Sequence, residues 1–380
     1  MKITRVKRNK KIRTIALALF LSLLMSSNIL YSALLSEEGK EQEKINKKKN
    51  RLIFLPIIYY TPETKIAAGV GGIYYFRTSK SGSEKRPSSI LMDLVYTGMK
   101  QVLLEFFPDI YMRKGEYHLI GSLSYKKYTE KFFGVGNTTS ENMEENYSFR
   151  AAKLDLSLQK EVSEQLYIGI QYEFESNRII ETEGGGQLER RDILGSEGGT
   201  ASGFGLVLNW DNRDNIFFPT QGRFYQISAK FFNKAFGSDF NFNRFNLNFS
   251  QYFSFFSSHV LVFQSYINIV TGHPPFQMLS LLGGQNLMRG YYKGRYRDKN
   301  MIALQMEYRI PVWWRLGLVG FIGYGDVADE LSHFKFGDFK YSGGWGIRYK
   351  ISREEGTNLR LDFGFGRGTS GVYVTVNEAF

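Results

Sequence analysis

The chain has 380 residues, of which 16% are aromatic, with 39 Gly, 8 Pro and no Cys. The many Phe and Tyr residues favour β-strands, and the scarcity of Pro excludes collagen-like and proline-rich disordered chains. Without Cys there can be no disulfide scaffold, thiolate metal site or cysteine nucleophile. Of the net charge of +12, residues 1–13 supply +7 and residues 34–51 supply +2, which leaves +3 (12 − 7 − 2) for residues 52–380. A body so close to neutral gives no charge argument for nucleic-acid binding.

Residues 1–33 have the three-part organisation of a secretory signal peptide. Seven cations precede the apolar run from Ile15 to Met25, and a short segment with small residues ends at Ala33. The apolar run is shorter than a membrane-spanning helix requires. We therefore predict export with cleavage near Ala33; the alternative is an uncleaved membrane anchor.

Residues 34–51 are polar and rich in charge, with too little apolar surface to fold alone. We predict that this segment is a periplasmic tether. It is too short for a periplasmic accessory domain, so a single domain is expected over residues 52–380.

From residue 52 onward, apolar and polar residues alternate. Tyr341, Trp345 and Ile347 alternate with Ser342 and Arg348, and the stretches 168–175 and 357–366 repeat the pattern. Such alternation predicts strands with one apolar and one polar face. A soluble β-sandwich and a membrane barrel both have such strands. Their length, the aromatic excess and the charged opposite faces favour a transmembrane antiparallel β-barrel, an all-β fold.

Sixteen strands are expected, an even number, as in bacterial single-chain barrels. The first contains Pro56, which suits an edge or seam strand. The apolar parity shifts near Asn243–Arg244, which predicts a β-bulge. Long connections over 129–146, 178–201, 272–299 and 328–339 alternate with short turns, as external loops and periplasmic turns do. The expected strands are 53–60, 65–77, 89–99, 102–112, 116–127, 147–159, 165–177, 202–210, 222–232, 240–255, 259–271, 300–310, 316–327, 340–350, 357–366 and 371–380.

Four segments resemble the BamA/TamA-type outer-membrane barrels, also called the bacterial surface antigen family. LPIIYYTPETKIAAGVGGIYYFR (55–77) resembles the opening strands, and EYRIP (307–311) onward to Phe380 resembles the closing strands and the C-terminal assembly signal. NWDNRDNIFFPTQGRFYQISAKF (209–231) resembles the family's D-x-R-D…P-x-x-G turn. LGGQNLMRGYYKGRYRDKN (282–300) resembles its long inward-folding loop. The residues that match the turn are Asp211, Arg213, Asp214, Pro219 and Gly222, and those that match the R-G-[F/Y] loop signature are Met288, Arg289, Gly290 and Tyr291.

The resemblance implies a 16-stranded barrel in the bacterial outer membrane, inserted into the lipid bilayer by the barrel-assembly machinery. Full-length relatives carry periplasmic polypeptide-transport-associated domains and insert or secrete proteins. Residues 34–51 cannot hold such a domain, so we expect a short member that assists export or outer-membrane assembly, with a separate periplasmic protein as partner. Val372, Val374, Val376 and Phe380 share one parity and are expected to face lipid, although Glu378 interrupts that row.

The loop motif also has a physical interpretation. A loop that folds into a barrel must satisfy one buried cation, and the planar fork of Arg289 suits a carboxylate. Glu307 lies on the polar face of the strand after the loop, so we predict that it is the lumen partner of Arg289. At the family's second carboxylate position stands Gly323, and the spacing of Asp326 points it to the other face. The alternative is an Arg289 exposed in an external loop.

No pattern indicates catalysis. The four His are scattered and form no metal-binding motif, and no glycine loop has the context of a phosphate site. We therefore predict no catalytic, cofactor-binding or metal-binding residues. A passive channel or surface-exposed barrel is one alternative function, and an outer-membrane enzyme using His118 or His273 at a strand rim is another. The remaining lumen charges are expected to form a hydrogen-bonded lining: Asp155, Glu173, Glu175, Arg348, Arg360 and Asp362.

Overall fold

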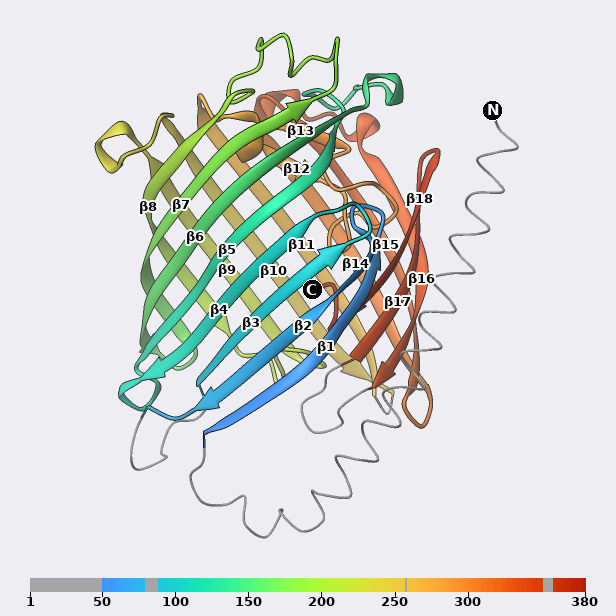
Figure 1. The fold of residues 1–380 in the computed structure, drawn as a ribbon. Helices are drawn as coiled ribbons and strands as arrows, with labels where there is room; N and C mark the ends of the chain where they lie inside the picture. The colour runs from blue at the N-terminus through green and yellow to red at the C-terminus, as the bar shows by residue number, and fades with distance from the viewer. Residues whose placement is uncertain (1–49, 79–87, 257, 351–357) are drawn as a thin grey trace.

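The computed structural model describes residues 50–78, 88–256, 258–350 and 358–380 (Figure 1). Sixteen antiparallel strands close into a barrel, and each pairs with its neighbours along the chain except where β14 follows β11 and β18 meets β1. The barrel strands are β1 (Arg51–Thr61), β2 (Lys65–Phe76), β3 (Ser88–Thr97), β4 (Val102–Met112), β5 (Tyr117–Phe132), β6 (Glu145–Ser163), β7 (Leu166–Thr182), β8 (Gly198–Asp211), β9 (Gly222–Phe232), β10 (Phe242–Phe255), β11 (His259–Gly272), β14 (Asn300–Trp313), β15 (Leu316–Ala328), β16 (Lys340–Lys350), β17 (Asn358–Gly366) and β18 (Thr369–Val376).

The expected count of sixteen strands is therefore confirmed. The observed bounds differ from the expected ones mainly in β5, β7 and β8, which extend further toward the long connections, and in β6, which is longer at both ends. β18 stops at Val376 instead of reaching Phe380. The signal-peptide assignment and most of the tether lie outside the described residues.

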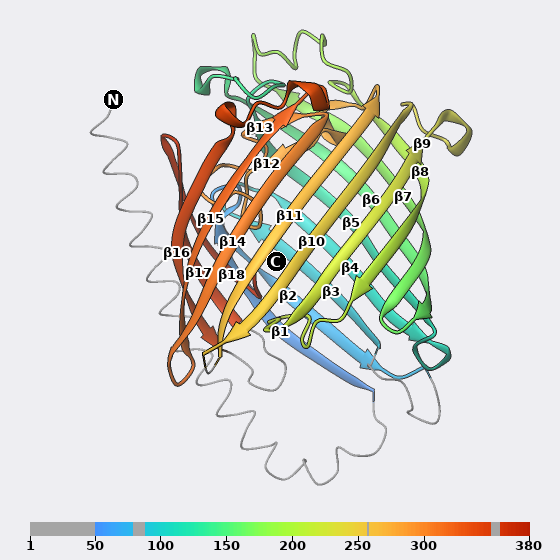
Figure 2. The ribbon, with the colours of Figure 1, turned by 180° about the vertical axis from the view of Figure 1, so that it is seen from behind.

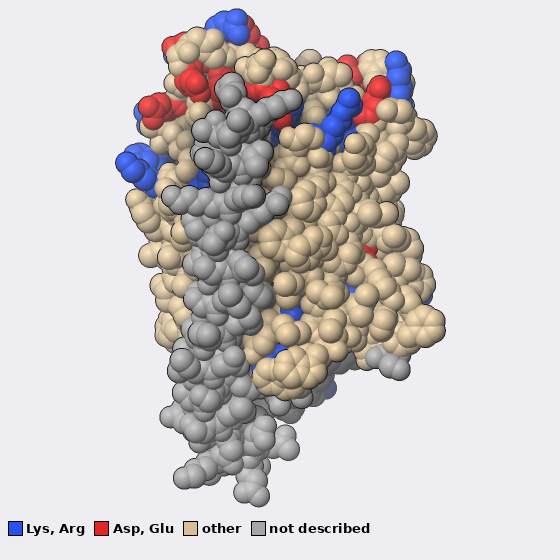
Figure 3. All heavy atoms as spheres, turned by 90° about the vertical axis from the view of Figure 1, so that its right-hand side faces the viewer, with Lys and Arg blue, Asp and Glu red and all other residues tan. Residues whose placement is uncertain are grey.

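The side chains of each strand divide between the two faces of the barrel wall. Leu104, Leu123, Ile170 and Leu206 are among the outward side chains and are more than half exposed, as expected where lipid takes the place of water. Charged side chains gather at the upper rim, above a belt of uncharged residues (Figure 3). In the part of the chain that the structure describes, no helix is long and apolar enough to cross a membrane.

The expected β-bulge near Asn243–Arg244 is wrong. The pairing of β10 with β9 and β11 runs through these positions without a register shift. The parity changes because Phe242 faces the lumen, where its ring stacks on that of Phe232 at a centroid distance of 4.2 Å and packs against Met278. Phe242 therefore packs against the inner loop and does not face lipid.

β1 lies at the seam, as Pro56 predicts. It pairs with β2 from Arg51–Tyr75 through Thr61–Lys65. Between the described residues of β1 and β18, the single paired position is Tyr60–Val374. The barrel is closed at this seam by much less backbone pairing than elsewhere.

The connection between β11 and β14 folds into the barrel and carries η4 (Phe276–Met278) and a two-stranded sheet of β12 (Ser280–Leu282) and β13 (Tyr296–Asp298). This segment lies inside the outline of the barrel in both opposite views (Figures 1 and 2). Leu282, Met288 and Tyr291 pack against Met301, Ala303 and Val327 of the wall. The remaining short 3-10 helices lie in the connections: η1 (Arg113–Gly115), η2 (Glu141–Met143), η3 (Lys234–Phe236), η5 (Leu331–His333) and η6 (Phe336–Asp338).

Candidate functional site

Arg289 at the tip of the inner loop contacts two carboxylates on different strands. Its Nη2 lies 2.5 Å from Glu307 Oε2 on β14, and its Nη1 lies 2.6 Å from Asp362 Oδ2 on β17. The guanidinium is 1% exposed and both carboxylates are fully buried. The fork of Arg289 therefore ties the loop to two strands that are far apart in sequence.

These three residues belong to a larger group, which we call the arginine–carboxylate cluster. Arg309 Nε lies 2.8 Å from Glu307 Oε1. Arg348 binds Asp362 Oδ1 at 2.5 Å through Nη1 and Glu378 Oε2 at 2.8 Å through Nε. The cluster consists of Arg289, Glu307, Arg309, Arg348, Arg360, Asp362 and Glu378.

Arg360 is the least paired of the four arginines in the cluster. Its Nε is 3.5 Å from Asp362, while its Nη2 donates to the carbonyl of Gln285 and to Asn286 Oδ1 on the inner loop. Burial by itself would lower the pKa of Arg289, but the carboxylates of Glu307 and Asp362 outweigh burial and raise it above its ordinary value. The two carboxylates thus stabilise the loop cation, and Arg360 donates to oxygens of the loop.

The barrel wall contacts the loop tip through the ring of Phe321 and leaves room for it at Gly323. The Arg289 guanidinium lies 3.5 Å from the centre of the Phe321 ring, a cation–π contact. A Cβ on Gly323 would lie 2.9 Å from Met288 Sδ, which explains a glycine where the family resemblance sought an acid. Asp362 supplies that second carboxylate instead. Asp326 is buried elsewhere, bound to Lys340 Nζ at 2.7 Å and to Asn137.

The neighbours of Arg289 in the motif fix the loop backbone. Gly290 donates its N–H to the Tyr373 hydroxyl at 3.0 Å, and that hydroxyl donates to the carbonyl of Tyr291. The Tyr291 hydroxyl donates to the carbonyl of Tyr341 and accepts from the N–H of Arg367. Met288 donates its N–H to Gln305 Oε1. Four strands therefore hold the loop tip: β14, β16, β17 and β18.

The second predicted motif forms the turn between β8 and β9, at the end of the barrel opposite to the long loops. Arg213 binds both oxygens of Asp211 at 2.8 and 2.9 Å, and Asp214 accepts from the N–H groups of Asn215, Thr220 and Gln221. Gly222 has a φ of +101°. The turn brings the carbonyl of Pro219 to 3.2 Å from Arg309 Nη1, so this motif meets the arginine–carboxylate cluster.

The expectation that Phe380 faces lipid is wrong. β18 ends at Val376, and Phe380 packs in the lumen against Tyr252, Val260 and Val262. Its carbonyl accepts from Arg309 Nη2 at 2.9 Å. The C-terminus lies within the outline of the barrel in both views (Figures 1 and 2). Val372 and Val374 lie on the outward face, as expected, because they pair with Phe363 and Leu361 in the row that carries the half-exposed Trp345. Both are buried there against Tyr60, Leu359 and Leu361.

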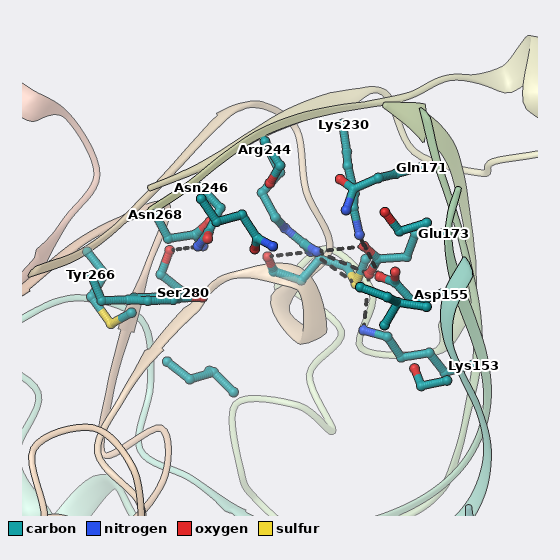
Figure 4. Close-up of a pocket in the computed structure, with 18 of the residues that line it drawn as sticks. Lys153, Asp155, Gln171, Glu173, Lys230, Arg244, Asn246, Tyr266, Asn268 and Ser280 are labelled. Carbon is teal, nitrogen blue, oxygen red and sulfur yellow. Dashed lines mark hydrogen bonds and ion pairs between the residues drawn. The ribbon is translucent and has the colours of Figure 1, made fainter. Parts of the chain in front are cut away.

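A second group of charges lines a lumen cavity of about 550 Å³ on the far side of the inner loop (Figure 4). Glu173 is at its centre: its carboxylate lies within 3.1 Å of Lys153, Lys230 and Arg244. Lys230 also binds Asp155 at 2.5 Å. Glu175 lies 3.3 Å from Lys153 and adds a third anion to the three cations. Because the charges then balance, the cavity is polar but lacks a concentrated charge for a single ionic ligand.

The histidines do not form a catalytic arrangement. His118 Nε2 lies 2.6 Å from Asp109 Oδ1, and its ring stacks on Tyr111, with no nucleophile in the contacts of the pair. His273 lies just after β11, where its N–H donates to the carbonyl of Asn241. Within the described ranges, no group of His, Asp and Glu could hold a metal ion.

Sequence reasoning assigned Asp362 and Arg348 to a general lining and overlooked Arg309 and Glu378 as partners. A signal was available for Asp362, because it stands on the polar face of its strand with Gly364 two positions on, the D-x-G spacing sought near residue 323. Parity placed Glu378 in the outward row of Val374, and its charge was the one sign in the sequence that the tail leaves this row.

The family model for the Omp85 superfamily domain matches residues 85–380. The chain belongs to the Omp85 superfamily. Among solved structures, this Omp85 barrel is similar to BamA from Haemophilus ducreyi lacking POTRA domains 1–3, with a TM-score of 0.60 and 14% identity over 87% of this chain and 71% of that one. It is also similar to CdiB from Acinetobacter baumannii (0.55, 11%, 86% and 59%) and to CdiB from Escherichia coli (0.54, 8%, 87% and 68%).

At these identities the similarity concerns the fold. The chain spans 59% of the Acinetobacter CdiB chain, so the match is to part of that protein. No curated protein matches this sequence.

Proposed function

We propose that this Omp85 barrel resides in the bacterial outer membrane and helps polypeptides to enter or cross that membrane at the seam between β1 and β18, with a separate periplasmic protein delivering them. The observation that carries the proposal is the single paired position, Tyr60–Val374, between these strands. We propose no catalytic residue or cofactor for this role, which needs a strand edge and no chemistry.

The tail of the chain supports the proposal. After Val376 the backbone turns at Asn377, which has a φ of +67°, and residues 377–380 enter the lumen. The part of β1 from Arg51 to Tyr59 therefore has β2 on one side and no pairing to described residues of β18 on the other. An unpaired strand edge in a bilayer leaves backbone groups whose exposure costs several kcal/mol each.

An incoming extended segment would satisfy this edge by β-augmentation, in which main-chain hydrogen bonds supply the affinity. Pro56 lacks a backbone N–H, so it interrupts the edge near its middle and disfavours a permanent partner. The similarity of the fold to BamA and CdiB supports a role in assembly or export.

Locking the seam tests the proposal. A Tyr60→Cys/Val374→Cys variant can form a disulfide across the paired position, and the absence of native Cys removes background pairing. In cells depleted of the native protein, we expect the oxidised variant to fail to restore the outer-membrane proteome and a reductant to rescue it. The matched control is Val70→Cys/Leu94→Cys, which joins β2 to β3. A locked seam with full complementation would overturn the proposal.

A passive channel is the second candidate, and the polar cavity of about 550 Å³ favours it. Residues 278–281 and 287 of the inner loop line this cavity, so we expect conduction to require a displacement of the loop. Single-channel recording in planar bilayers separates the two functions. Steady conductance that is unchanged by the seam disulfide, together with full complementation, would favour the channel.

A further inference from the structure

Three basic side chains form a row on the outer surface of the barrel. Lys127 on β5 pairs directly with Arg150 on β6, and Arg150 pairs directly with Arg178 on β7. All three are exposed. They share the outward face with Leu123, Leu154 and Ile170, which lie further down the same strands. These strands face the viewer in Figure 1.

The row marks one boundary of the apolar belt. On β6, ten residues separate Arg150 from Lys160, the outward cation at the other end of the strand. At about 3.4 Å per residue and a strand tilt near 45°, this corresponds to a height of about 24 Å. The apolar band of an outer-membrane barrel is about 25 Å tall. The three cations are therefore at the depth of lipid headgroups, beside the long connections.

The cations at the two boundaries differ in their partners. Lys160 lies 3.4 Å from Glu116. None of Lys127, Arg150 and Arg178 forms an ion pair within 4.0 Å with a carboxylate of the described chain, although Glu181 is on the same strand as Arg178. Like charges placed directly opposite on adjacent strands are destabilising. The fold thus keeps three mutually repelling cations together without a counterion among the described residues.

We propose that Lys127, Arg150 and Arg178 bind the phosphate groups of a phosphorylated glycolipid in the outer leaflet, whose acyl chains lie on the apolar belt below. Two guanidinium forks and an ammonium suit phosphate oxygens, and clustered cations at a membrane surface each attract anionic headgroups. Adjacent strands are about 4.8 Å apart, so the row spans about 10 Å. That span suits a headgroup with more than one phosphate. The inference rests on the proposed outer-membrane location, with the long connections facing outward.

Binding can be measured with the purified full-length chain in detergent, by native mass spectrometry during titration with bisphosphorylated lipid A. We expect the Lys127→Gln/Arg150→Gln/Arg178→Gln variant to bind at least tenfold more weakly. The matched control, Lys160→Gln, should bind as the wild type does. Lipid A without phosphates should bind weakly to both, and an excess of inorganic phosphate should displace little lipid because it lacks acyl chains.

A second measurement protects the test against misfolding. In phosphatidylcholine nanodiscs, removal of the repulsion should leave the triple variant as resistant to heat as the wild type, or more so. Equal lipid A affinity of wild type and triple variant would overturn the inference, and so would equal binding of phosphate-free lipid A. These lipid-binding measurements use no client protein. If the seam disulfide had no effect on complementation, the proposed function would be contradicted, but the inference about this lipid site would not be affected.

Discussion

Gly290 and Gly364 meet backbone to backbone, although one lies in the inner loop and the other in β17. A Cβ on Gly364 would lie 2.6 Å from the nitrogen of Gly290, and a Cβ on Gly290 would lie 2.6 Å from the nitrogen of Phe365. Neither contact can be relieved by a flexible side chain. This approach brings Arg289 within reach of Asp362, so the two glycines determine whether the loop can dock.

We expect Gly364→Ala to displace the loop tip and to destabilise the barrel by about 1–3 kcal/mol, the usual cost of overpacking. The measurement is protease cleavage within residues 272–299 of the detergent-folded barrel, which should increase. Gly320→Ala in β15 is the matched control, because a Cβ there meets nothing within 4 Å. Equal protection in both variants would show that the close approach does not hold the loop.

We expect Arg289→Ala and Glu307→Ala each to destabilise the barrel by at most the roughly 3–5 kcal/mol of a broken buried ion pair, because Glu307 keeps Arg309 and Arg289 keeps Asp362 as a second partner. Their effects should be less than additive, with a coupling of about 0.5–3 kcal/mol. The measurement is the urea concentration at which the unheated barrel loses its compact migration in gel electrophoresis. Arg289→Lys should recover only part of the loss, because one ammonium cannot reach both carboxylates.

The control for this cycle is Arg191→Ala, which removes an exposed pair with Glu197 and should cost at most about 1 kcal/mol. Strict additivity of Arg289→Ala and Glu307→Ala would mean that their contact does not couple the loop to β14.

The strands could be predicted because an apolar outer face and a polar lumen face impose a period of two, which is clearest in β6, β7, β14, β16 and β17. The contact of Arg289 with Glu307 was also within reach, since a buried cation requires an anion and Glu307 stands on the polar face of the next strand. The contact of Arg289 with Asp362 was harder to predict, because it depends on which part of the barrel wall the loop touches. The alternation identifies a lumen face but not which lumen residues meet across it.

Phe380 shows where the alternation rule is insufficient. Parity assigned it to lipid together with Val374, but the same parity would place the Glu378 carboxylate in lipid. Turning inward at Asn377 instead brings Glu378 to Arg348 and Asn358. One charge thus decides the position of the whole tail, and its partners lie 20 or more positions away in sequence, so no local pattern reveals them.

We expect Glu378→Ala to release the tail from the lumen. With Ala379→Cys as the only thiol, a membrane-impermeant maleimide applied to the detergent-folded barrel should react slowly, because Ala379 is 8% exposed. Adding Glu378→Ala should raise the reaction rate at least tenfold. Glu164→Ala in the β6–β7 turn is the matched control. Equal rates in the two backgrounds would mean that Phe380 alone holds the tail.

We expect Asp214→Ala to loosen the β8–β9 turn and to weaken its contact with Arg309 of the arginine–carboxylate cluster. Asp214 accepts from three backbone N–H groups and from the Thr220 hydroxyl, so its removal leaves four donors to find water. A loss of about 1–2 kcal/mol is expected, as for other capping carboxylates. Freed from this turn, the Pro219 carbonyl should no longer reach Arg309.

Limited proteolysis should then cut within residues 212–221, where the wild type resists. Asp214→Asn should behave nearly as the wild type does, because its amide oxygen can still accept from the backbone. If Asp214→Ala also resists cleavage, the turn is held by its contacts with Arg309 and not by its own carboxylate.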